Sequence, residues 1–519
     1  MPSKNGSNGT PRFTTQSSLS AYVWSICDIL RRSNCAGALQ YVPELTWILF
    51  LRVLDDLETL EAEQSQAVGA AFTPSLEAPY RWQDWAAPDG WKRRELEGGA
   101  LGAFFGFVNG ELLPYLKSLR DQPNATARQK VISEIMSGVD RVRVDTERNF
   151  LDVLDKVHLI NSQTVDSTHL FALSQVYEGL LLKMGEKGND GGQFFTPRQV
   201  IKAMVRAIDP GPADTIYDPC AGTGGFLATA YEYVLQKLGD DATPEQLEAL
   251  KTRRLYGREK ENLIYPIALA NLVLHGIDKP NLWHGNTLTG QEIYGGLWEG
   301  APAQFDVILT NPPFGGKEGK VAQARFAYKT SATQVLFLQH VIDSLKSGGR
   351  CAIVLDEGVS FRQETAFVQT KRKLLNEADV WCILSLPPGT FVNAGAGVKT
   401  NIFFFTKGRP TERIWYYDLS GVKVGKKSPL TLEHFEEFFR LLPTRADSER
   451  SWTVSRAELE ARNYDLKAVN PHAKLDTDTR SVEELLKVIE NKEQEINEAL
   501  NLLRARRAGS MQTTKKAPA

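Results

Sequence analysis

The chain has 519 residues, of which 42% are hydrophobic and 24% are charged, and its formal net charge is −2. This length allows about three or four domains, and the ordinary apolar fraction excludes a chain that is disordered throughout. A protein that holds DNA alone through its phosphates usually carries a basic excess. Any nucleic-acid role of this chain must therefore use a local basic patch or a partner.

The cysteines are scattered and form no CxxC pair, which excludes a disulfide framework and a zinc site. They are Cys27, Cys35, Cys220, Cys351 and Cys382. We expect no metal site. No apolar run approaches the ~20 residues of a membrane span, and the N-terminus has no apolar signal core. We expect a reduced, soluble, cytoplasmic protein without a membrane partner.

The first part of the chain is predicted to be helical. Residues 1–17 are polar and are expected to form a disordered tail. Apolar residues then recur every three or four positions, which is typical of amphipathic helices, over 19–63, 101–119, 127–136 and 150–160. With little strand signal before residue 210, we predict an all-helical N-terminal domain over residues 18–165.

The pattern changes after Asp209, where short β-type runs alternate with helical stretches. The predicted strands are Thr215–Tyr217, Leu255–Tyr256, Asn281–Trp283, Phe305–Leu309, Cys351–Leu355, Val380–Leu386 and Asn401–Phe405. Such alternation predicts an α/β domain with a doubly wound, mostly parallel sheet, which we assign to residues 166–410. Ligands of such sheets bind outside the carboxyl ends of the strands.

Residues 411–475 are mixed and polar, and a heptad helix is predicted over residues 476–508. Its apolar positions repeat every seven residues at Val482, Ile489, Ile496 and Leu503. A surface helix packed on its own domain would also fit, but an exposed heptad stripe favours a partner helix. We therefore predict a C-terminal helical extension for subunit contact, followed by a disordered tail over residues 509–519.

A glycine-rich turn, Asp218-Pro-Cys-Ala-Gly-Thr-Gly-Gly-Phe226, follows the first predicted strand and opens a helix. Glycines allow close approach of a ligand to the main chain, and the helix N-terminus offers free N–H groups. No GxxxxGK[ST] pattern is present, so a P-loop is not predicted. The second predicted strand is followed by Gly257-Arg258-Glu259, and an acidic residue at this place is where doubly wound folds bind a ribose hydroxyl pair.

A second motif, Asn311-Pro312-Pro313-Phe314, lies at the end of a later apolar strand. The Asn311 side-chain oxygen and the Pro312 carbonyl could accept both N–H groups of an exocyclic amine. Proline stiffens the turn and sets where that carbonyl points. Phe314 offers a face on which a flipped-out base can stack.

The segment Gly192-Gln-Phe-Phe-Thr-Pro-Arg-Gln199 predicts a capped helix start. Thr196 is expected as the N-cap, Pro197 as the first helical residue, and Gln199 as the closing residue of a capping box. A loop held in this way beside the sheet can line a cofactor pocket.

Together these residues resemble the modification (DNA methyltransferase) subunits of type I restriction-modification systems. The resemblance covers most of the chain and includes the helical N-terminal domain and the C-terminal helix. Its motifs are YEGLL at 177–181, GQFFTPR at 192–198, DPCAGTGGF at 218–226, NPPF at 311–314, LPPGTFVNAGAGVKTNIFFF at 386–405 and RNYDLKAVNPH at 462–472.

The resemblance implies a Rossmann-like domain that transfers a methyl group from S-adenosylmethionine to N6 of a flipped-out adenine in duplex DNA. It implies cofactor contacts at Gln193, Phe194, Phe195, Thr196, Pro197, Arg198, Asp218, Thr223, Gly224, Gly225 and Glu259. The adenine would be held by Asn311, Pro312, Pro313 and Phe314, with Phe391 as a second stacking candidate or a core aromatic. The implied partners are DNA, a specificity subunit, a second copy of this chain and, in systems that have one, a restriction subunit.

Two other functions stay open at this point. An Asn-Pro-Pro-aromatic motif also suits a planar amide or another base, so the substrate could be a protein glutamine or an RNA base. A catalytically silent scaffold that only binds S-adenosylmethionine is the other alternative, against which the intact motif argues. Cys220 lies in the glycine-rich turn, away from the predicted base site, and is interpreted as a small buried residue.

Overall fold

The computed structural model describes residues 16–161, 196–277, 279–391, 399–425, 428–472 and 481–513. Most of the predicted tail over 1–17 and the three residues Gln193, Phe194 and Phe195 lie outside this part. None of the helices within these ranges is long and apolar enough to cross a membrane. The chain divides into two compact units, with the boundary in the sequence between Asn470 and Pro471, and each is described by itself.

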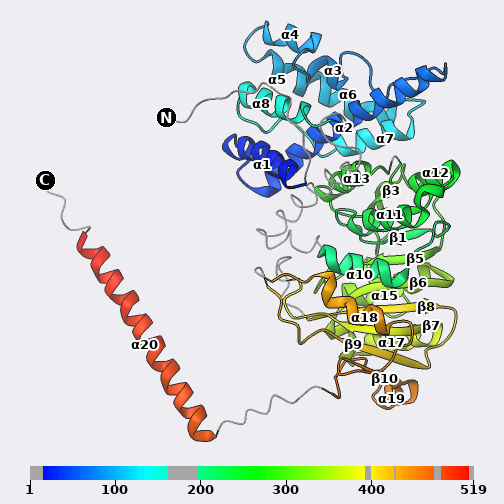
Figure 1. The fold of residues 1–519 in the computed structure, drawn as a ribbon, viewed down its shortest axis with the longest axis vertical. Coiled ribbons are helices and arrows are strands. Elements are labelled where there is room, and N and C mark those ends of the chain that lie inside the picture. Colours follow the sequence, from blue (N-terminus) through cyan, green and yellow to red (C-terminus); the bar gives the residue numbers. More distant parts are fainter. Residues whose placement is uncertain are drawn as a thin grey trace. The chain divides into compact units, whose positions relative to one another are not determined.

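The first unit begins with helices alone (Figure 1). They are α1 (Gln16–Arg32), α2 (Ala38–Ala67), α3 (Trp82–Trp85), α4 (Trp91–Glu97), α5 (Ala103–Phe107), α6 (Leu113–Ser118), α7 (Ala127–Met136) and α8 (Glu147–His158). The predicted apolar face of α1 is confirmed, because Leu19, Val23, Ile26 and Leu30 are all buried. Helices α2 and α7 pack against α13 (Ile264–Leu274), which joins this region to the sheet.

The rest of the first unit is built around one sheet of ten strands in the order β10-β9-β7-β8-β6-β5-β1-β2-β3-β4. The strands are β1 (Ile216–Asp218), β2 (Leu255–Glu259), β3 (Asn281–Asn286), β4 (Gln291–Tyr294), β5 (Phe305–Thr310), β6 (Leu345–Asp356), β7 (Ala378–Ser385), β8 (Thr400–Lys407), β9 (Arg413–Asp418) and β10 (Ser451–Ser455). Every neighbouring pair in the series β3-β2-β1-β5-β6 is parallel, and β7 also runs parallel to β9. Strand β8 is antiparallel to both β6 and β7, so the sheet is mixed beyond its parallel core.

All seven predicted strands are present, and the doubly wound α/β prediction is confirmed. The sequence pattern does not predict β4, β9 or β10. The last two extend the sheet into the region after Lys407, where β9 pairs with β7 and β10 pairs with β9. These strands are short, and their pairing depends on β7, which is more than two dozen residues away in the chain.

The sheet is covered on both faces. Along β5, Val307 and Leu309 belong to one core cluster while Ile308 belongs to the other, because successive side chains of a strand point to opposite faces. The first cluster includes α10 (Arg198–Ile208), α11 (Gly225–Leu238) and α13; the second includes α15 (Thr333–Ser344) and α17 (Thr365–Glu377). The smaller helices are α12 (Pro244–Arg253), α14 (Lys320–Gln323), α16 (Glu357–Phe361), α18 (Glu436–Leu441) and α19 (Arg456–Ala461).

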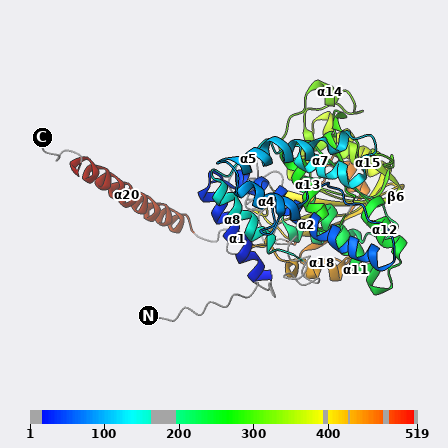
Figure 2. The ribbon, with the colours of Figure 1, turned by 90° about the horizontal axis from the view of Figure 1, so that it is seen from above.

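The strand order reverses between β1 and β5. From β1 the chain proceeds through β2 to β3 on one side, whereas β5 and β6 lie on the other. A crevice outside the carboxyl ends of two such strands is the usual ligand site of an open α/β sheet. The glycine-rich turn follows β1 and the Asn-Pro-Pro-Phe motif follows β5, so the two motifs meet at this point. Seen from above, α14, in the connection after this motif, projects at the edge of the first unit (Figure 2).

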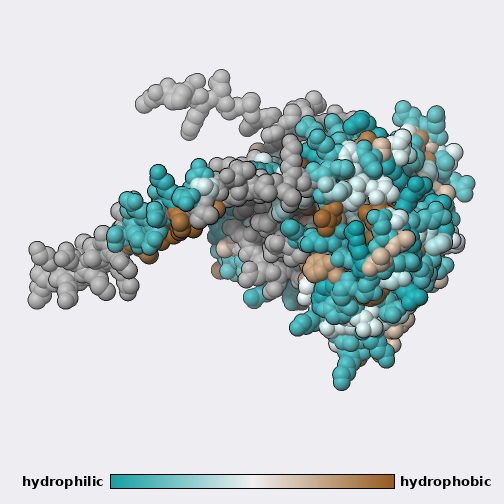
Figure 3. Space-filling model, turned by 90° about the horizontal axis from the view of Figure 1, so that it is seen from below, coloured by the Kyte–Doolittle hydropathy of each residue, from teal (hydrophilic) through white to brown (hydrophobic). Residues whose placement is uncertain are grey.

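The second unit contains α20 (Val482–Thr513). The predicted helix is present, but it continues to Thr513, so residues 509–513 are helical rather than part of the predicted tail. Figure 3 shows apolar side chains gathered along one side of this helix. The large apolar residues exposed on it are Leu486, Val488, Ile489, Ile496 and Leu500.

Candidate active site

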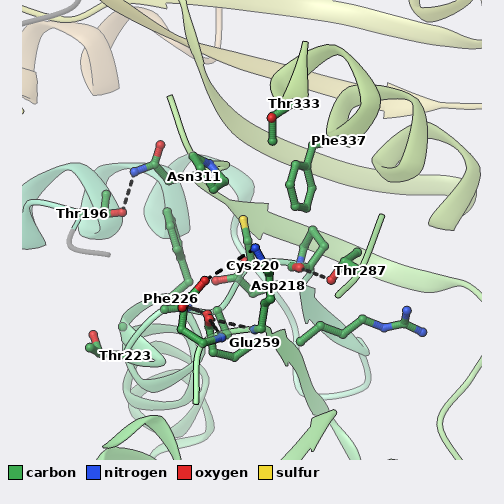
Figure 4. Close-up of a pocket in the computed structure, with 18 of the residues that line it drawn as sticks. Thr196, Asp218, Cys220, Thr223, Phe226, Glu259, Thr287, Asn311, Thr333 and Phe337 are labelled. Atoms are coloured by element: carbon green, nitrogen blue, oxygen red, sulfur yellow. Dashed lines mark hydrogen bonds and ion pairs between the residues drawn. The ribbon is translucent and has the colours of Figure 1, made fainter. Parts of the chain in front are cut away.

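A cavity of about 340 Å³ opens at the carboxyl ends of four parallel strands (Figure 4). Its lining includes Asp218 from β1, Glu259 from β2, Asn286 from β3 and Asn311, which directly follows β5. A volume of this size falls in the range of small-molecule sites. The cavity therefore lies where the strand order predicts a ligand.

The glycine-rich turn forms one wall. Gly222 and Gly224 have φ angles of 53° and 81°, a region that glycine adopts without steric cost. Gly224 is the N-cap of α11, and a Cβ there would stand 3.2 Å from Cγ of Leu272 in α13. The turn is therefore packed tightly against α13 and leaves its opposite side open to the cavity.

Glu259 is held by main-chain donors on both carboxylate oxygens. Its Oε1 accepts from the N–H groups of Lys260 and Glu261, each at 2.8 Å, and its Oε2 accepts from the Gly222 N–H at 2.8 Å. Burial raises the pKa of Glu259 to about 7, against the lowering effect of these donors. The carboxylate thus ties the turn after β1 to the end of β2 and faces the cavity in one orientation.

Asp218 links the two central strands at the switch point. Its Oδ1 accepts from the Thr310 hydroxyl at 2.7 Å and from the Cys220 N–H at 3.1 Å. Its Oδ2 is buried and has no hydrogen-bond partner among the described residues. Burial raises the pKa of Asp218 to about 7. Because Asp218 lines the cavity, the unused oxygen is available to a ligand that donates a hydrogen bond.

Asn311 is oriented from outside its own loop. Its Nδ2 donates to the Thr196 hydroxyl at 3.0 Å, which fixes the amide so that Oδ1 points away from that contact. This Oδ1 is buried and has no partner within the described part of the chain. A buried acceptor without a donor is costly, so its free state indicates that a ligand supplies the donor.

The capping prediction for Thr196 is wrong. Helix α10 begins at Arg198 with Pro197 as its N-cap, and no side chain caps it. The Thr196 hydroxyl is engaged by Asn311, a residue 115 positions away. The structure therefore uses this threonine to orient an amide of the site, and the helix starts later than the local pattern predicts.

Of the residues after Asn311 in the second motif, Pro312 and Phe314 are not lining residues of the cavity. Pro312 is buried and Pro313 lines the cavity. The Phe314 ring meets the Phe391 ring edge to face, with centroids 5.2 Å apart and an angle of 71° between the planes. Phe391 is only 1% exposed, so it supports Phe314 from the core, and the more accessible ring of the pair is Phe314.

The structure brings most of the predicted cofactor residues to one cavity. Its lining includes Thr196, Arg198, Asp218, Thr223, Gly225 and Glu259, whereas Pro197 and Gly224 are not lining residues. Sequence reasoning missed Asn286, Thr287 and Leu288 at the end of β3, as well as Ile201, Phe226 and Phe337. The doubly wound pattern could have indicated the β3 residues, because the end of every parallel strand faces the same edge.

Comparison with known proteins gives matches along nearly the whole chain. The family model of N-6 DNA methylases matches residues 168–479, and that of the HsdM N-terminal domain matches residues 19–155. The EcoEI type I restriction enzyme methylase subunit of Escherichia coli is 34% identical over 94% of this chain and 97% of its own length. The EcoKI methylase subunit of Escherichia coli K12 is 30% identical over 85% of this chain and 80% of its own.

Two solved structures agree with this result. A modification subunit of a type I restriction enzyme from Vibrio vulnificus YJ016 has a TM-score of 0.75 at 32% identity, covering 90% of this chain and 99% of that one. A chain from a study of complex assembly and conformational transition of the type I R-M system has a TM-score of 0.74 at 35% identity. It covers 98% of this chain and all of that one. The likeness thus includes the N-terminal helices as well as the sheet.

Proposed function

The chain belongs to the family of type I restriction enzyme methylase subunits, and on this premise we propose which part of its site binds the cofactor and which part binds the target base. The protein is an adenine-specific DNA methyltransferase of the N-6 DNA methylase family. We propose that the β1–β2–β3 side of the cavity holds S-adenosylmethionine and that the end of β5 holds the target adenine. The free Oδ1 of Asn311 is the observation that carries the assignment.

The cofactor side fits a nucleoside with hydroxyl and ammonium donors. The fixed carboxylate of Glu259 suits a ribose hydroxyl pair, and the unused Oδ2 of Asp218 is a second buried acceptor. Gly222 and Gly225 leave the main chain open, and the cavity is also lined by Thr196, which precedes α10, and by Arg198, its first residue. When bound, S-adenosylmethionine supplies a methyl group already activated by its sulfonium, so the protein's main task is alignment.

The target side would hold an exocyclic amine by both of its N–H groups. Asn311 Oδ1 and the Pro312 carbonyl are two acceptors at the end of one strand. Accepting hydrogen bonds from both N–H groups favours a more tetrahedral nitrogen, whose lone pair is released from the ring and can attack the methyl carbon. The N–C bond would form as the S–C bond breaks, with its electron pair staying on sulfur, and the nitrogen would then lose one proton. Preorganised dipoles of this kind stabilise charge that develops in the transition state. Phe314 offers the stacking face for the flipped base.

The approach of DNA is supported by a local basic segment. The connection after Phe314 carries Lys317, Lys320, Arg325 and Lys329, all exposed, against one acidic residue, Glu318. Lys317 also lines the cavity. This concentration of positive charge in a chain of net charge −2 suits a phosphate backbone beside the flipped base. Cellular DNA as substrate makes the cytoplasm the proposed place of action.

The protein works in a type I restriction-modification complex, as the family implies. We propose that its partners there are a specificity subunit, which reads the DNA sequence, and a second copy of this chain. The exposed apolar stripe of α20 supports a helical partner, because such a stripe is normally covered. A protein glutamine or an RNA base as substrate is not favoured by the relatives, which are methylase subunits of restriction enzymes.

The assignment of Glu259 predicts a pH-dependent cofactor affinity. The pKa of Glu259 is raised to about 7. The carboxylate form, which accepts from hydroxyl donors, therefore becomes populated as the pH rises through 7 and is protonated at lower pH. We expect S-adenosylmethionine to bind up to about 10-fold more weakly at pH 6 than at pH 8, measured by calorimetry. Glu259→Gln should bind weakly at both values with a flatter profile. Equal pH dependence in the wild type and Glu259→Gln would contradict the assignment.

Transfer of labelled methyl groups from S-adenosylmethionine to duplex DNA tests the function directly. We expect transfer by the complex with the specificity subunit and little transfer by the chain alone, since the chain lacks a sequence reader in this proposal. Digestion to nucleosides should place the label in N6-methyladenine. Label on protein or RNA, with none on DNA, would overturn the proposal.

A further inference from the structure

We propose that Gln334 is a positioning residue for methyl transfer, because its side-chain amide holds the Pro312 carbonyl in place to receive the target amine. This inference rests on the proposed role of Pro312 as an acceptor. Gln334 is not a member of either motif found in the sequence. It lies in the first turn of α15, 22 residues after Pro312.

Gln334 is held at both ends of its amide. Its Nε2 donates to the Pro312 carbonyl oxygen at 3.1 Å, and its Oε1 accepts from the Asp356 N–H at 2.8 Å. The residue is 3% exposed, so water does not compete for these bonds. The amide therefore connects the loop after β5 to the end of β6, and the bond to Asp356 fixes which end faces Pro312.

The Pro312 carbonyl needs such a support. It belongs to a Pro-Pro amide whose own two residues have no N–H group, and no main-chain N–H of the described residues donates to this oxygen. A carbonyl oxygen has two lone pairs. Gln334 occupies one of them, which leaves the second for the N–H of the target base.

The other end of the support is itself rigid. Asp356 is the N-cap of α16, where its Oδ1 accepts from the Val359 N–H at 3.1 Å. The same strand, β6, pairs with β5 and with β8. The position of the Pro312 oxygen is thus tied to the middle of the sheet rather than to the loop after β5.

The two acceptors of the site are then held in parallel ways. Thr196 orients the Asn311 amide from the residues just before α10, and Gln334 orients the Pro312 carbonyl from α15. Thr196 precedes the motif in the sequence and Gln334 follows it, and the helices α10 and α15 pack on opposite faces of the sheet. Two fixed acceptors define both the position and the plane of the amine. A single fixed acceptor would leave the amine free to rotate about one hydrogen bond.

The same helix supplies a matched control. Gln339 is 1% exposed, and its amide is likewise held at both ends, donating to the Tyr328 carbonyl and accepting from the Tyr328 N–H, each at 3.0 Å. Its partner, Tyr328, lies outside the Asn-Pro-Pro-Phe motif, whereas the partner of Gln334 is Pro312 within it. Gln334→Met and Gln339→Met therefore remove the same group, with the same number of bonds, from the same helix.

The test measures kcat for methyl transfer at saturating DNA and cofactor, using the complex with the specificity subunit. We expect Gln334→Met to lower kcat about 10- to 100-fold. Its cofactor affinity should equal that of Gln339→Met, and both variants should change the melting temperature by the same amount. Gln339→Met should keep kcat within about twofold. With 2-aminopurine at the target position, both variants should still show the fluorescence rise of base flipping.

Gln334→Glu adds a signature that a loss of packing would not give. Its carboxylate cannot donate to Pro312, whereas its protonated form can, so we expect the kcat of Gln334→Glu, relative to wild type, to recover as the pH falls. Equal loss of kcat in Gln334→Met and Gln339→Met, or no loss in either, would overturn the proposal. If Asn311→Ala also kept its activity, the assignment of the acceptors itself would be wrong; if only Gln334→Met did, the error would lie with Gln334 alone.

Discussion

Asn311→Ala is expected to lower kcat for DNA methylation about 100- to 1000-fold in the complex with the specificity subunit. The variant removes the buried Oδ1 that has no partner among the described residues and that we assign to one N–H of the adenine amine. Deleting one preorganised hydrogen-bonding group at a reacting centre typically costs a factor of this size. Single-turnover methyl transfer at saturating DNA and cofactor measures it.

Thr196→Val refines this test, because it leaves Asn311 in place but removes the hydroxyl that accepts a hydrogen bond from Asn311 Nδ2. The amide can then turn, and we expect a smaller loss, about 10-fold. Cofactor binding by Asn311→Ala should equal that of the wild type, since Asn311 is assigned to the base. An Asn311→Ala enzyme that retained more than a tenth of the wild-type kcat would contradict the role of this side chain as an acceptor.

Ile489→Asp combined with Ile496→Asp is expected to weaken assembly with the specificity subunit about 100-fold or more. The two side chains lie seven residues apart on α20 and are 62% and 58% exposed. Burying an isoleucine in an interface contributes about 2 kcal/mol, and a carboxylate in the same place must also be desolvated. Sedimentation or light scattering of the mixed subunits measures the change.

Gln494→Asp combined with Asn501→Asp is the control for this pair. It adds the same charge to the same helix, five residues after each isoleucine, on the polar side of the heptad pattern. We expect normal assembly from it and normal cofactor affinity from both double variants, because α20 belongs to a separate unit from the cavity. Truncation after Asp476 should reproduce the defect of the isoleucine pair. Unchanged assembly in that truncation would exclude α20 as the contact.

The core of the sheet and the two motifs were predictable because each is a local pattern. A continuous apolar run such as Phe305–Leu309 predicts a buried strand, and a strand followed by glycines and a helix predicts the turn after Asp218 wherever the rest of the chain lies. The heptad repeat from Val482 likewise specifies a helix by itself. Knowing that parallel strands end at one edge was enough to bring Glu259 and Asn311 to one site.

What only the tertiary structure decided are the bonds between residues far apart in the chain. The hydroxyl of Thr196 orients Asn311 instead of capping a helix, and Gln334 reaches Pro312 from a helix that no motif marks. The pairing of β9 and β10 and the packing of Phe391 beneath Phe314 are of the same kind. The sequence determined which groups can react, because side-chain chemistry and strand periodicity are local. The fold decided how those groups are oriented, because a hydrogen bond needs a distance near 3 Å and a direction, which only closure of the whole sheet sets.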